Sequence, residues 1–502
     1  MKHNFLTYIL FIAFAMLVAS ACNKSFLDTQ PKGQVLESNY YQNANQAYAG
    51  LVSIYVATAT ETSGTAINWY CNKLGPLNSA GDECYTGGGG STDMASWQAW
   101  NNYTLTAANG PQAGFWGVDY QGIYRANLLL SKITSGIPGL ADADKTRFIA
   151  EAKFLRAYFY FELVRLFQNI PLIVAPISSS DWYTITQAKP ADVYAQIEKD
   201  LNDAIGGLPS VVAASENGRV TKGAAMAELG KVILYQNNTS RMQEAASWFE
   251  KVSTSGVYSL LPNYGDIFSP SNKFNSESIL EIVHSSLKNS WWGMDPFPGN
   301  LYVEMTGPRS YSGPTYWSGG WSFNPIITAF ATAMKSDPRY PYTCANIDSI
   351  VNAAPGRSYV KGYQNTGYFI QKYAPLQQYV NPNAQPELNF PNDYIEIRLA
   401  DVYLMEAEAL VRGGGSAATA QTYLDRVRAR VGLPSVPATL ANIYNERKLE
   451  LATEGHRWYD LVRTGQAATA LAFKGFTAGK NELMPIPLNE LNNTKLVQNP
   501  GY

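Results

Sequence analysis

Few residues of this sequence combine the type and the spacing that catalysis requires. Its three histidines, His3, His284 and His456, form no HExxH pattern, and no GxSxG, GxxxxGKS/T or GxGxxG motif occurs. The neighbouring carboxylates Asp82 and Glu83 lie in a loop flanked by aromatic residues, and glycoside hydrolysis uses a pair of carboxylates. Because sequence neighbours need not face one cleft, a glycoside hydrolase or lyase is the alternative hypothesis rather than the leading one.

The cysteines give little support for metal chemistry. Beyond Cys22 they are Cys71, Cys84 and Cys344. No CxxC pair and no spaced set of cysteines and histidines occurs, which argues against a structural zinc site. Cys71 and Cys84 are compatible with a local disulfide in an exported protein and equally with two free thiols.

Aromatic residues are the first unusual feature of the composition. The 502 residues include 11 Trp, 33 Tyr and 20 Phe, whereas charged residues make up 16%, against roughly 25% in an average soluble domain. Tyrosine and tryptophan offer rigid amphipathic surface for stacking on flat ligands, although a tyrosine-rich core explains the same composition. The composition excludes a disordered chain, a collagen and a multi-pass membrane protein. A net charge of −2 without a basic run argues against a nucleic-acid partner.

The first 21 residues are typical of a targeting segment. Lys2 and His3 precede an apolar run over residues 5–18, which is short for a membrane-spanning helix and ends in small residues. Cys22 follows directly and resembles the acylated cysteine of a bacterial lipobox, although Ala19 stands where leucine is usual. We expect residues 1–21 to be a lipoprotein signal peptide and Cys22 to be lipidated, which would anchor the chain stably. The alternative is an ordinary signal peptide.

The elements that must position any site are mostly helices. A period of 3.6 residues in the apolar positions predicts helices over residues 115–132, 147–167, 190–206, 220–236, 241–252, 393–412, 416–431 and 439–464. Two of the helix pairs weakly match the tetratricopeptide pattern, the first through Leu229-Gly230, Ala245 and Phe249. Residues 60–114 and 256–390 lack a period and are rich in Gly, Asn, Ser, Pro and aromatics. Long irregular stretches of this kind usually carry function.

Motifs in a fixed order resemble the SusD/RagB family along nearly the whole chain. They are Phe26-Leu27-Asp28, Asp82-Glu83, Trp116 with Tyr120 and Asn127, 151–158, Ile170-Pro171-Leu172, 218–225, Tyr394 with 398–402, Glu446-Arg447 with Glu450, 454–461, Pro485-Ile486-Pro487 and 498–502. The resemblance implies a mainly α fold, a SusD-like helical scaffold of tetratricopeptide-like helix pairs with long irregular loop insertions. We expect a single unit over residues 22–502, with the scaffold at about 115–255 and 391–465 and the ligand-binding insertions at about 60–114 and 256–390.

The resemblance also implies a function without bond breaking. Members of this family are lipid-anchored on the outside of the outer membrane and act as a lid over a SusC-like TonB-dependent transporter barrel. They capture an oligosaccharide, polysaccharide or other large nutrient and pass it to the barrel. No cofactor is implied. Calcium occurs in some members, but no ligand set is evident here.

The family's ligand-binding aromatics lie in variable loops, which directs attention to the two insertions. Aromatic rings cover the apolar faces of sugars, while amides and guanidinium groups bond the hydroxyls. The candidate ligand-binding residues are Trp97, Trp100, Asn101, Trp291, Trp292, Arg309, Tyr316, Trp317 and Trp321. A peptide-binding lid of the same family is a further alternative. The charged motif residues Arg219, Lys222, Arg398, Arg447, Glu450, Glu454 and Arg457 are expected to tie helices together.

Overall fold

A computed structural model describes residues 40–63, 73–286, 291–292, 298–314, 317–492 and 494–502. The predicted signal peptide, the predicted lipidation site Cys22, Cys71 and Tyr316 lie outside these residues. The remaining cysteines, Cys84 and Cys344, are buried free thiols.

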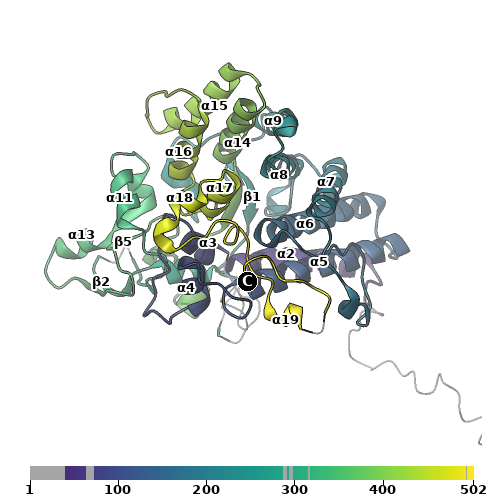
Figure 1. Cartoon of the computed structure of the whole chain (residues 1–502), viewed down its shortest axis with the longest axis horizontal. Helices are drawn as coiled ribbons and strands as arrows, with labels where there is room; N and C mark the ends of the chain where they lie inside the picture. Colours follow the sequence, from purple (N-terminus) through teal and green to yellow (C-terminus); the bar gives the residue numbers. More distant parts are fainter. Residues whose placement is uncertain (1–39, 64–72, 287–290, 293–297, 315–316, 493) are drawn as a thin grey trace, which may run out of the picture.

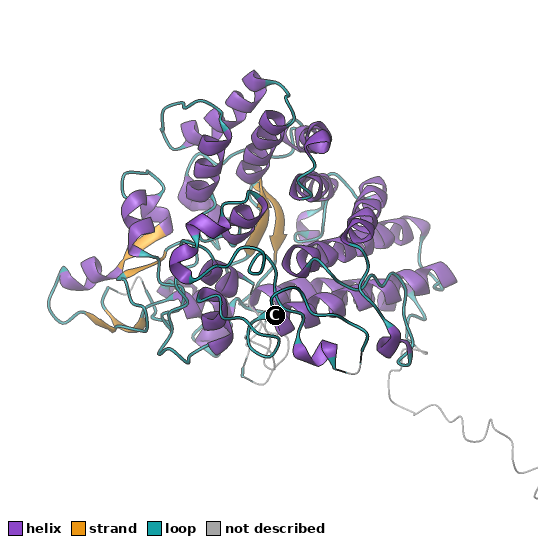
Figure 2. Cartoon of the chain, in the orientation of Figure 1, coloured by secondary structure: helices purple, strands orange, loops and turns teal. Residues whose placement is uncertain are grey.

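Helices dominate the described part of the chain, which confirms the mainly α fold (Figure 2). The long ones form the scaffold on the right and at the top of Figure 1. These scaffold helices are α2 (Ala44–Ser63), α5 (Gln112–Ser135), α6 (Asp142–Phe167), α7 (Pro190–Gly207), α8 (Lys222–Tyr235), α9 (Met242–Ser253), α14 (Leu399–Arg412), α15 (Ala417–Arg430), α16 (Leu440–Glu450) and α17 (Arg457–Arg463). Short α18 (Ala467–Ala470) and α19 (Leu488–Leu491) follow.

Antiparallel helix pairs build the scaffold, and local sequence explains how one of them forms. Helix α8 begins after Thr221, whose side chain accepts a hydrogen bond from the backbone N–H of Ala224. Its partner α9 lies close because Gly230 has no side chain, and a Cβ there would lie 2.7 Å from the ring of Phe249. Gly230 and Phe249 are two of the positions that suggested the tetratricopeptide pattern.

Helix α2 was not among the predicted helices, and two of the predicted helices contain other structure. Residues at the start of the expected helix 393–412 form strand β6 (Tyr394–Arg398), which is buried throughout and pairs antiparallel with β1 (Ser278–Ile282). The expected helix 439–464 is divided into α16 and α17 because Thr453 and Gly455 adopt positive φ angles of 66° and 82°. A right-handed helix cannot continue through such residues.

The two insertions, which were expected to be irregular, contain short helices and strands. The first insertion contains α3 (Leu74–Ala80) and α4 (Ala95–Asn101). The second contains α10 (Leu301–Thr306), β2 (Arg309–Ser312), α11 (Thr328–Met334), α12 (Tyr340–Thr343), β3 (Cys344–Asn346), α13 (Ile347–Asn352), β4 (Ser358–Val360) and β5 (Tyr368–Ile370). Strand β2 pairs with β4 and β3 with β5, both antiparallel. Elements of this second insertion form the left side of the molecule in Figure 1.

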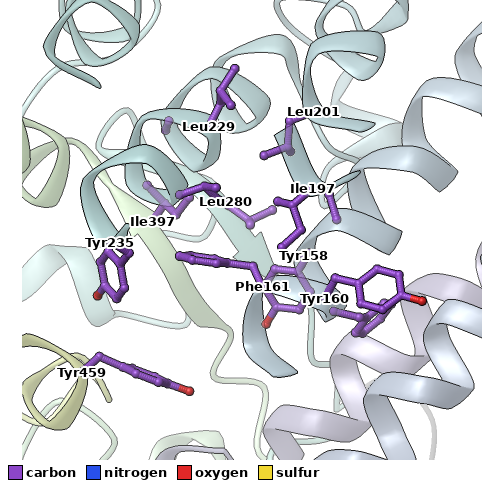
Figure 3. Close-up of a cluster of buried hydrophobic side chains, with 14 of the residues drawn as sticks. Tyr158, Tyr160, Phe161, Ile197, Leu201, Leu229, Tyr235, Leu280, Ile397 and Tyr459 are labelled. Carbon is purple, nitrogen blue, oxygen red and sulfur yellow. The ribbon is translucent and has the colours of Figure 1, made fainter. Parts of the chain in front are cut away.

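A large apolar core lies between the scaffold helices and the β1–β6 pair. Figure 3 shows part of it, with Leu280 of β1 and Ile397 of β6 between side chains of α6, α7 and α8. A smaller, separate cluster lies among the insertions and consists of Met94, Trp97, Leu301, Met305, Phe323 and Leu388. The partly buried Trp321 packs against this second cluster.

Candidate glycan-binding site

Two tryptophans from distant parts of the second insertion stack on each other. The indole rings of Trp292 and Trp321 are nearly parallel, with centroids 6.3 Å apart and an angle of 18° between their planes. Trp292 is 41% exposed and the adjacent Trp291 is 52% exposed, whereas Trp321 is half-buried. We call Trp291, Trp292 and Trp321 the tryptophan platform.

The ring separation decides how the platform can bind. A sugar ring held between two indoles makes carbon contacts on both faces, which requires a separation of about 7–8 Å, twice the ~3.5–4.0 Å contact distance. The observed 6.3 Å is too short for this arrangement. The exposed surface of Trp291 and Trp292 is therefore what a ligand can contact, and Trp321 supports Trp292 from the side away from solvent.

Polar groups surround the platform. The indole N–H of Trp292 donates to Oε1 of Glu387 at 2.8 Å. Arg309 donates from Nη2 to the backbone oxygen of Trp321 at 3.0 Å, and the same nitrogen lies 3.6 Å from Oδ2 of Asp93. Its Nε finds no acceptor among the described residues, although the side chain is 34% exposed. The Nε itself is buried, so only the exposed part of the Arg309 side chain can meet a hydroxyl beside the aromatic surface.

The small apolar cluster supports the platform from below. Trp321 packs against this cluster, in which Trp97 is fully buried and meets Phe323 edge-on with centroids 5.5 Å apart. Trp97 also lies directly over Gly75, where a Cβ would be 1.9 Å from the indole. Trp97 is therefore part of the buried cluster under Trp321 and offers no exposed surface of its own.

Four predicted ligand-binding residues lie in the interior, contrary to expectation. Trp97 and Trp100 have no exposed surface, and Asn101 and Trp317 are buried. Trp100 packs edge-on against Trp458 in the main core, and Trp317 lies in a separate cluster of the second insertion. A side chain without exposed surface cannot cover a sugar face, so these four residues are not part of the platform. The structure brings Trp291, Trp292, Arg309 and Trp321 together.

Two acidic residues at the platform were not predicted. Glu387 lies in the 3₁₀ helix η9 (Pro386–Leu388), and Glu304 lies in α10. Nothing in the spacing of a single glutamate within an irregular segment marks it as part of a site. The contact between Glu387 and Trp292 joins residues 95 positions apart, which only the fold reveals.

Glu304, whose backbone oxygen accepts from the N–H of Trp321 at 3.1 Å, predicts a pH-dependent stability. Burial, with a contribution from nearby Glu387, raises the pKa of Glu304 to about 7. The neutral form therefore stabilises the fold fully below the ordinary pKa of about 4.5, and this contribution is lost as the pH rises through 7. We expect Glu304→Gln, which stays neutral, to raise the thermal midpoint at pH 8 and to leave it nearly unchanged near pH 4.5.

Thermal unfolding of both proteins across this pH range measures the effect, with the exposed Glu250 changed to glutamine as the matched control. A difference between Glu304→Gln and the wild type that does not grow with pH would contradict the prediction.

The bond from Trp292 to Glu387 predicts a moderate effect on binding. Glu387→Ala removes the acceptor that fixes the indole, and one hydrogen bond to a charged group is worth about 1.5–3 kcal/mol before the free ring relaxes. We expect glycan binding at the platform to weaken roughly three- to tenfold. Affinity electrophoresis measures this change, and Glu387→Gln, which retains an acceptor, should restore much of the binding. Equal losses in the two variants would show that the bond does not orient Trp292.

The candidate catalytic groups are part of the framework. Asp82 accepts two hydrogen bonds from Arg457 and one from Lys448; burial opposes its ionisation, but these cations hold its pKa at about 2. Burial raises the pKa of Glu83 to about 7, and its carboxylate accepts from the backbone N–H of Thr453. Burial also lowers the pKa of His284 and of His456, and both side chains lie in the interior.

Within the described residues, no three His, Cys, Asp or Glu side chains lie together in a way that could hold a metal ion. No described helix combines the length and the apolar character needed to cross a membrane.

A helical scaffold with an aromatic surface on its insertions defines a class of binding proteins, and comparison identifies the family. Two family profiles match: the SusD family over residues 335–502 and a family described as starch-binding and associating with the outer membrane over residues 31–234. A solved laminarin-binding SusD-like protein is 45% identical, with 92% of this chain and 100% of that chain covered and a TM-score of 0.87. The chain belongs to the SusD/RagB family, as predicted.

More distant relatives agree with this assignment. The structure of surface glycan-binding protein A from Bacteroides thetaiotaomicron in complex with laminarihexaose is 27% identical, covers 91% of this chain and 99% of that chain, and has a TM-score of 0.84. A SusD-like protein from Bacteroides ovatus is 26% identical over 90% of this chain and 82% of its own length. The two solved relatives are named for binding a glycan and not for a reaction, in agreement with the prediction that the chain is not an enzyme.

Proposed function

We propose that this protein is a surface glycan-binding lipoprotein that captures polysaccharide at the tryptophan platform. The observation that carries the proposal is the exposed surface of Trp291 and Trp292, held in place by Trp321 and Glu387. Flat aromatic surface with hydrogen-bonding groups at its edge matches the two faces of a sugar, which are apolar C–H groups and hydroxyls. Arg309 and Asp93 supply the polar groups.

Laminarin is the first glycan to test. The 45% identical relative is named for binding laminarin, and the more distant one was solved with laminarihexaose. We propose the same ligand class for this chain, because insertions of similar architecture carry the exposed tryptophans here.

Delivery to a transporter completes the proposal. Lipidation of Cys22 would hold the protein at the outer membrane, facing the exterior, and a SusC-like TonB-dependent barrel would receive the glycan beneath this protein as its lid. The family and the description of the second matching profile support this part. Co-purification of the lipidated protein with a TonB-dependent barrel from solubilised outer membranes tests it; recovery without any barrel would count against the lid role.

Affinity electrophoresis of the mature chain lacking Cys22 tests glycan capture. Gels containing laminarin, starch, xylan or no polysaccharide are run in parallel, and we expect retardation by laminarin with the polymer recovered intact. Shortened polymer would instead support the hydrolase or lyase. No retardation by any glycan would overturn the proposal, and binding of peptides under the same conditions would favour the peptide-binding lid.

A further inference from the structure

A second cleft with aromatic walls lies in the second insertion. It has a volume of about 290 Å³, near the lower end of the roughly 300–1,000 Å³ of small-molecule sites. Its walls include the rings of Phe268, Tyr342 and Tyr379, and its polar lining includes Asn392, Gln378, Lys372 and the exposed Asp266. None of these residues belongs to the tryptophan platform or was predicted from the sequence.

The aromatic walls are held in fixed positions. Tyr342 is 44% exposed, and one face of its ring lies against Gly265, where a Cβ would be only 2.4 Å from the ring. Its other neighbour is Tyr264, met edge-on with centroids 6.1 Å apart. The Phe268 ring lies under the ammonium group of Lys372 at 4.8 Å. The cleft therefore presents rigid ring surface to solvent before any ligand arrives.

The polar groups of the cleft favour a neutral ligand. Asn392 is 5% exposed, and its Oδ1 accepts no hydrogen bond within the described residues. Lys372 is fully engaged, since its Nζ donates to Glu454 at 2.6 Å and to the backbone oxygens of Glu450 and Ala452. With that cation neutralised and a buried amide oxygen awaiting a donor, the cleft suits hydroxyl groups better than a phosphate or carboxylate.

One segment joins the cleft to the platform. Tyr379 lies in the 3₁₀ helix η8 (Gln377–Tyr379), and Asn392 lies five residues after Glu387, which holds Trp292. Asn381, which lies between Tyr379 and Asn392 in the sequence, donates from Nδ2 to the backbone oxygen of Ser286 at 3.1 Å. This hydrogen bond connects the segment to a residue that precedes Trp291 in the sequence by five positions. Residues 377–392 thus contribute to both surfaces.

We propose that this cleft is a second sugar-binding subsite, which engages another part of the same polysaccharide chain. The inference rests on the proposed function, because the ligand class is the same. Aromatic rings against sugar faces and the Asn392 amide against a hydroxyl would give the subsite its affinity. A polymer that reaches both surfaces binds more tightly than a fragment that reaches one, because the second contact is intramolecular.

Affinity electrophoresis in laminarin gels tests the subsite with matched variants. We expect Tyr342→Ala to weaken laminarin binding about three- to tenfold, the contribution of one ring against one sugar face. Tyr379→Ala should act in the same direction. Tyr183→Ala, which removes an exposed tyrosine of η4 (Asp181–Thr184), serves as the control and should leave binding unchanged. The laminarin gel should still retard the Trp292→Ala variant in part, and this remaining retardation should be absent in the double variant that also carries Tyr342→Ala.

The outcomes separate this inference from the function on which it rests. A retarded wild type with Tyr342→Ala and Tyr379→Ala both equal to Tyr183→Ala would overturn the subsite and leave the platform intact. A wild type that no polysaccharide retards would overturn the proposed function, and the subsite with it. Equal thermal midpoints of the wild type and the tyrosine variants, measured in parallel, establish that a loss of binding is not a loss of fold.

Discussion

Replacing Trp292 by alanine is expected to weaken laminarin binding by about 10- to 100-fold, or about 1.4–2.8 kcal/mol. Trp292 is the platform residue with both an exposed face and a fixed orientation, because Trp321 stacks behind it and Glu387 accepts from its indole nitrogen. Burying much of one indole face against a sugar yields free energy of this size. Calorimetry with laminarihexaose and electrophoresis in laminarin gels both measure the change.

A matched control separates ring removal at the platform from ring removal anywhere. Trp182 is 45% exposed, close to the 41% of Trp292, and lies beside Trp116 and Tyr120 on the scaffold. Trp182→Ala should therefore remove a similar surface without changing laminarin binding. Wild-type affinity in Trp292→Ala, or an equal loss in both variants, would exclude the platform as the principal contact.

The sequence was sufficient to predict the fold class because helices and framework motifs are local signals. Apolar periodicity located the long helices from residue 112 onward but not α2, and the order of motifs indicated the family. The predicted helix boundaries were wrong where tertiary structure overrides the local preference for helix. Residues 394–398 became a strand because β1 offers a pairing partner from 120 residues earlier, and the predicted last helix breaks where Thr453 and Gly455 have positive φ angles. The spacing of apolar residues predicts neither the strand nor the break in the helix.

The structure leaves some of the predicted ligand-binding residues exposed and buries others, and the tryptophans show why the sequence could not separate them. Trp97 and Trp292 lie in equally irregular, aromatic-rich segments, so the sequence offers no basis for separating them. The difference is tertiary: Trp97 packs between Gly75 and Phe323, whereas Trp292 lies on the outer side of Trp321. The exposed fraction of a side chain depends on which residues cover it, and those residues come from segments that are distant in the sequence.

The role of the charged motif residues was easier to predict from the sequence than the exposure of the tryptophans, because both partners of an ion pair are chemically recognisable. Arg219 pairs with Glu151, Arg447 with Asp401 and Asp460, and Arg457 with Asp82, which confirms the expectation that these residues tie elements together. For Lys222 no ion pair is found within the described residues. The sequence did not indicate how many cations converge on a single buried carboxylate.

Glu450 is that carboxylate, and its replacement by alanine is expected to destabilise the protein by about 3–5 kcal/mol. The side chain is fully buried and accepts from Arg398 at 2.6 Å, from Arg339 at 2.8 Å and from Arg430. Removing it leaves three buried guanidinium groups with one anion fewer, and an uncompensated buried charge is costly. The shift of the urea and thermal unfolding midpoints at pH 7 measures this loss.

The pH dependence of that loss distinguishes a lost ion pair from a lost side-chain volume. Burial alone would raise the pKa of Glu450, but Arg430, Arg398 and Arg339 hold it well below its ordinary value of 4.5. The stability that ionised Glu450 contributes is therefore present above the unfolded pKa near 4.5 and is lost as the pH falls toward the folded pKa. Glu450→Gln, which keeps the volume, should be much less stable than the wild type at pH 7, and the gap should narrow steadily below pH 4.5. A gap that is independent of pH would assign the effect to packing. A negligible gap at pH 7 would show that the three arginines are satisfied by their remaining partners, which are Glu277, Asp337, Glu446 and Glu454.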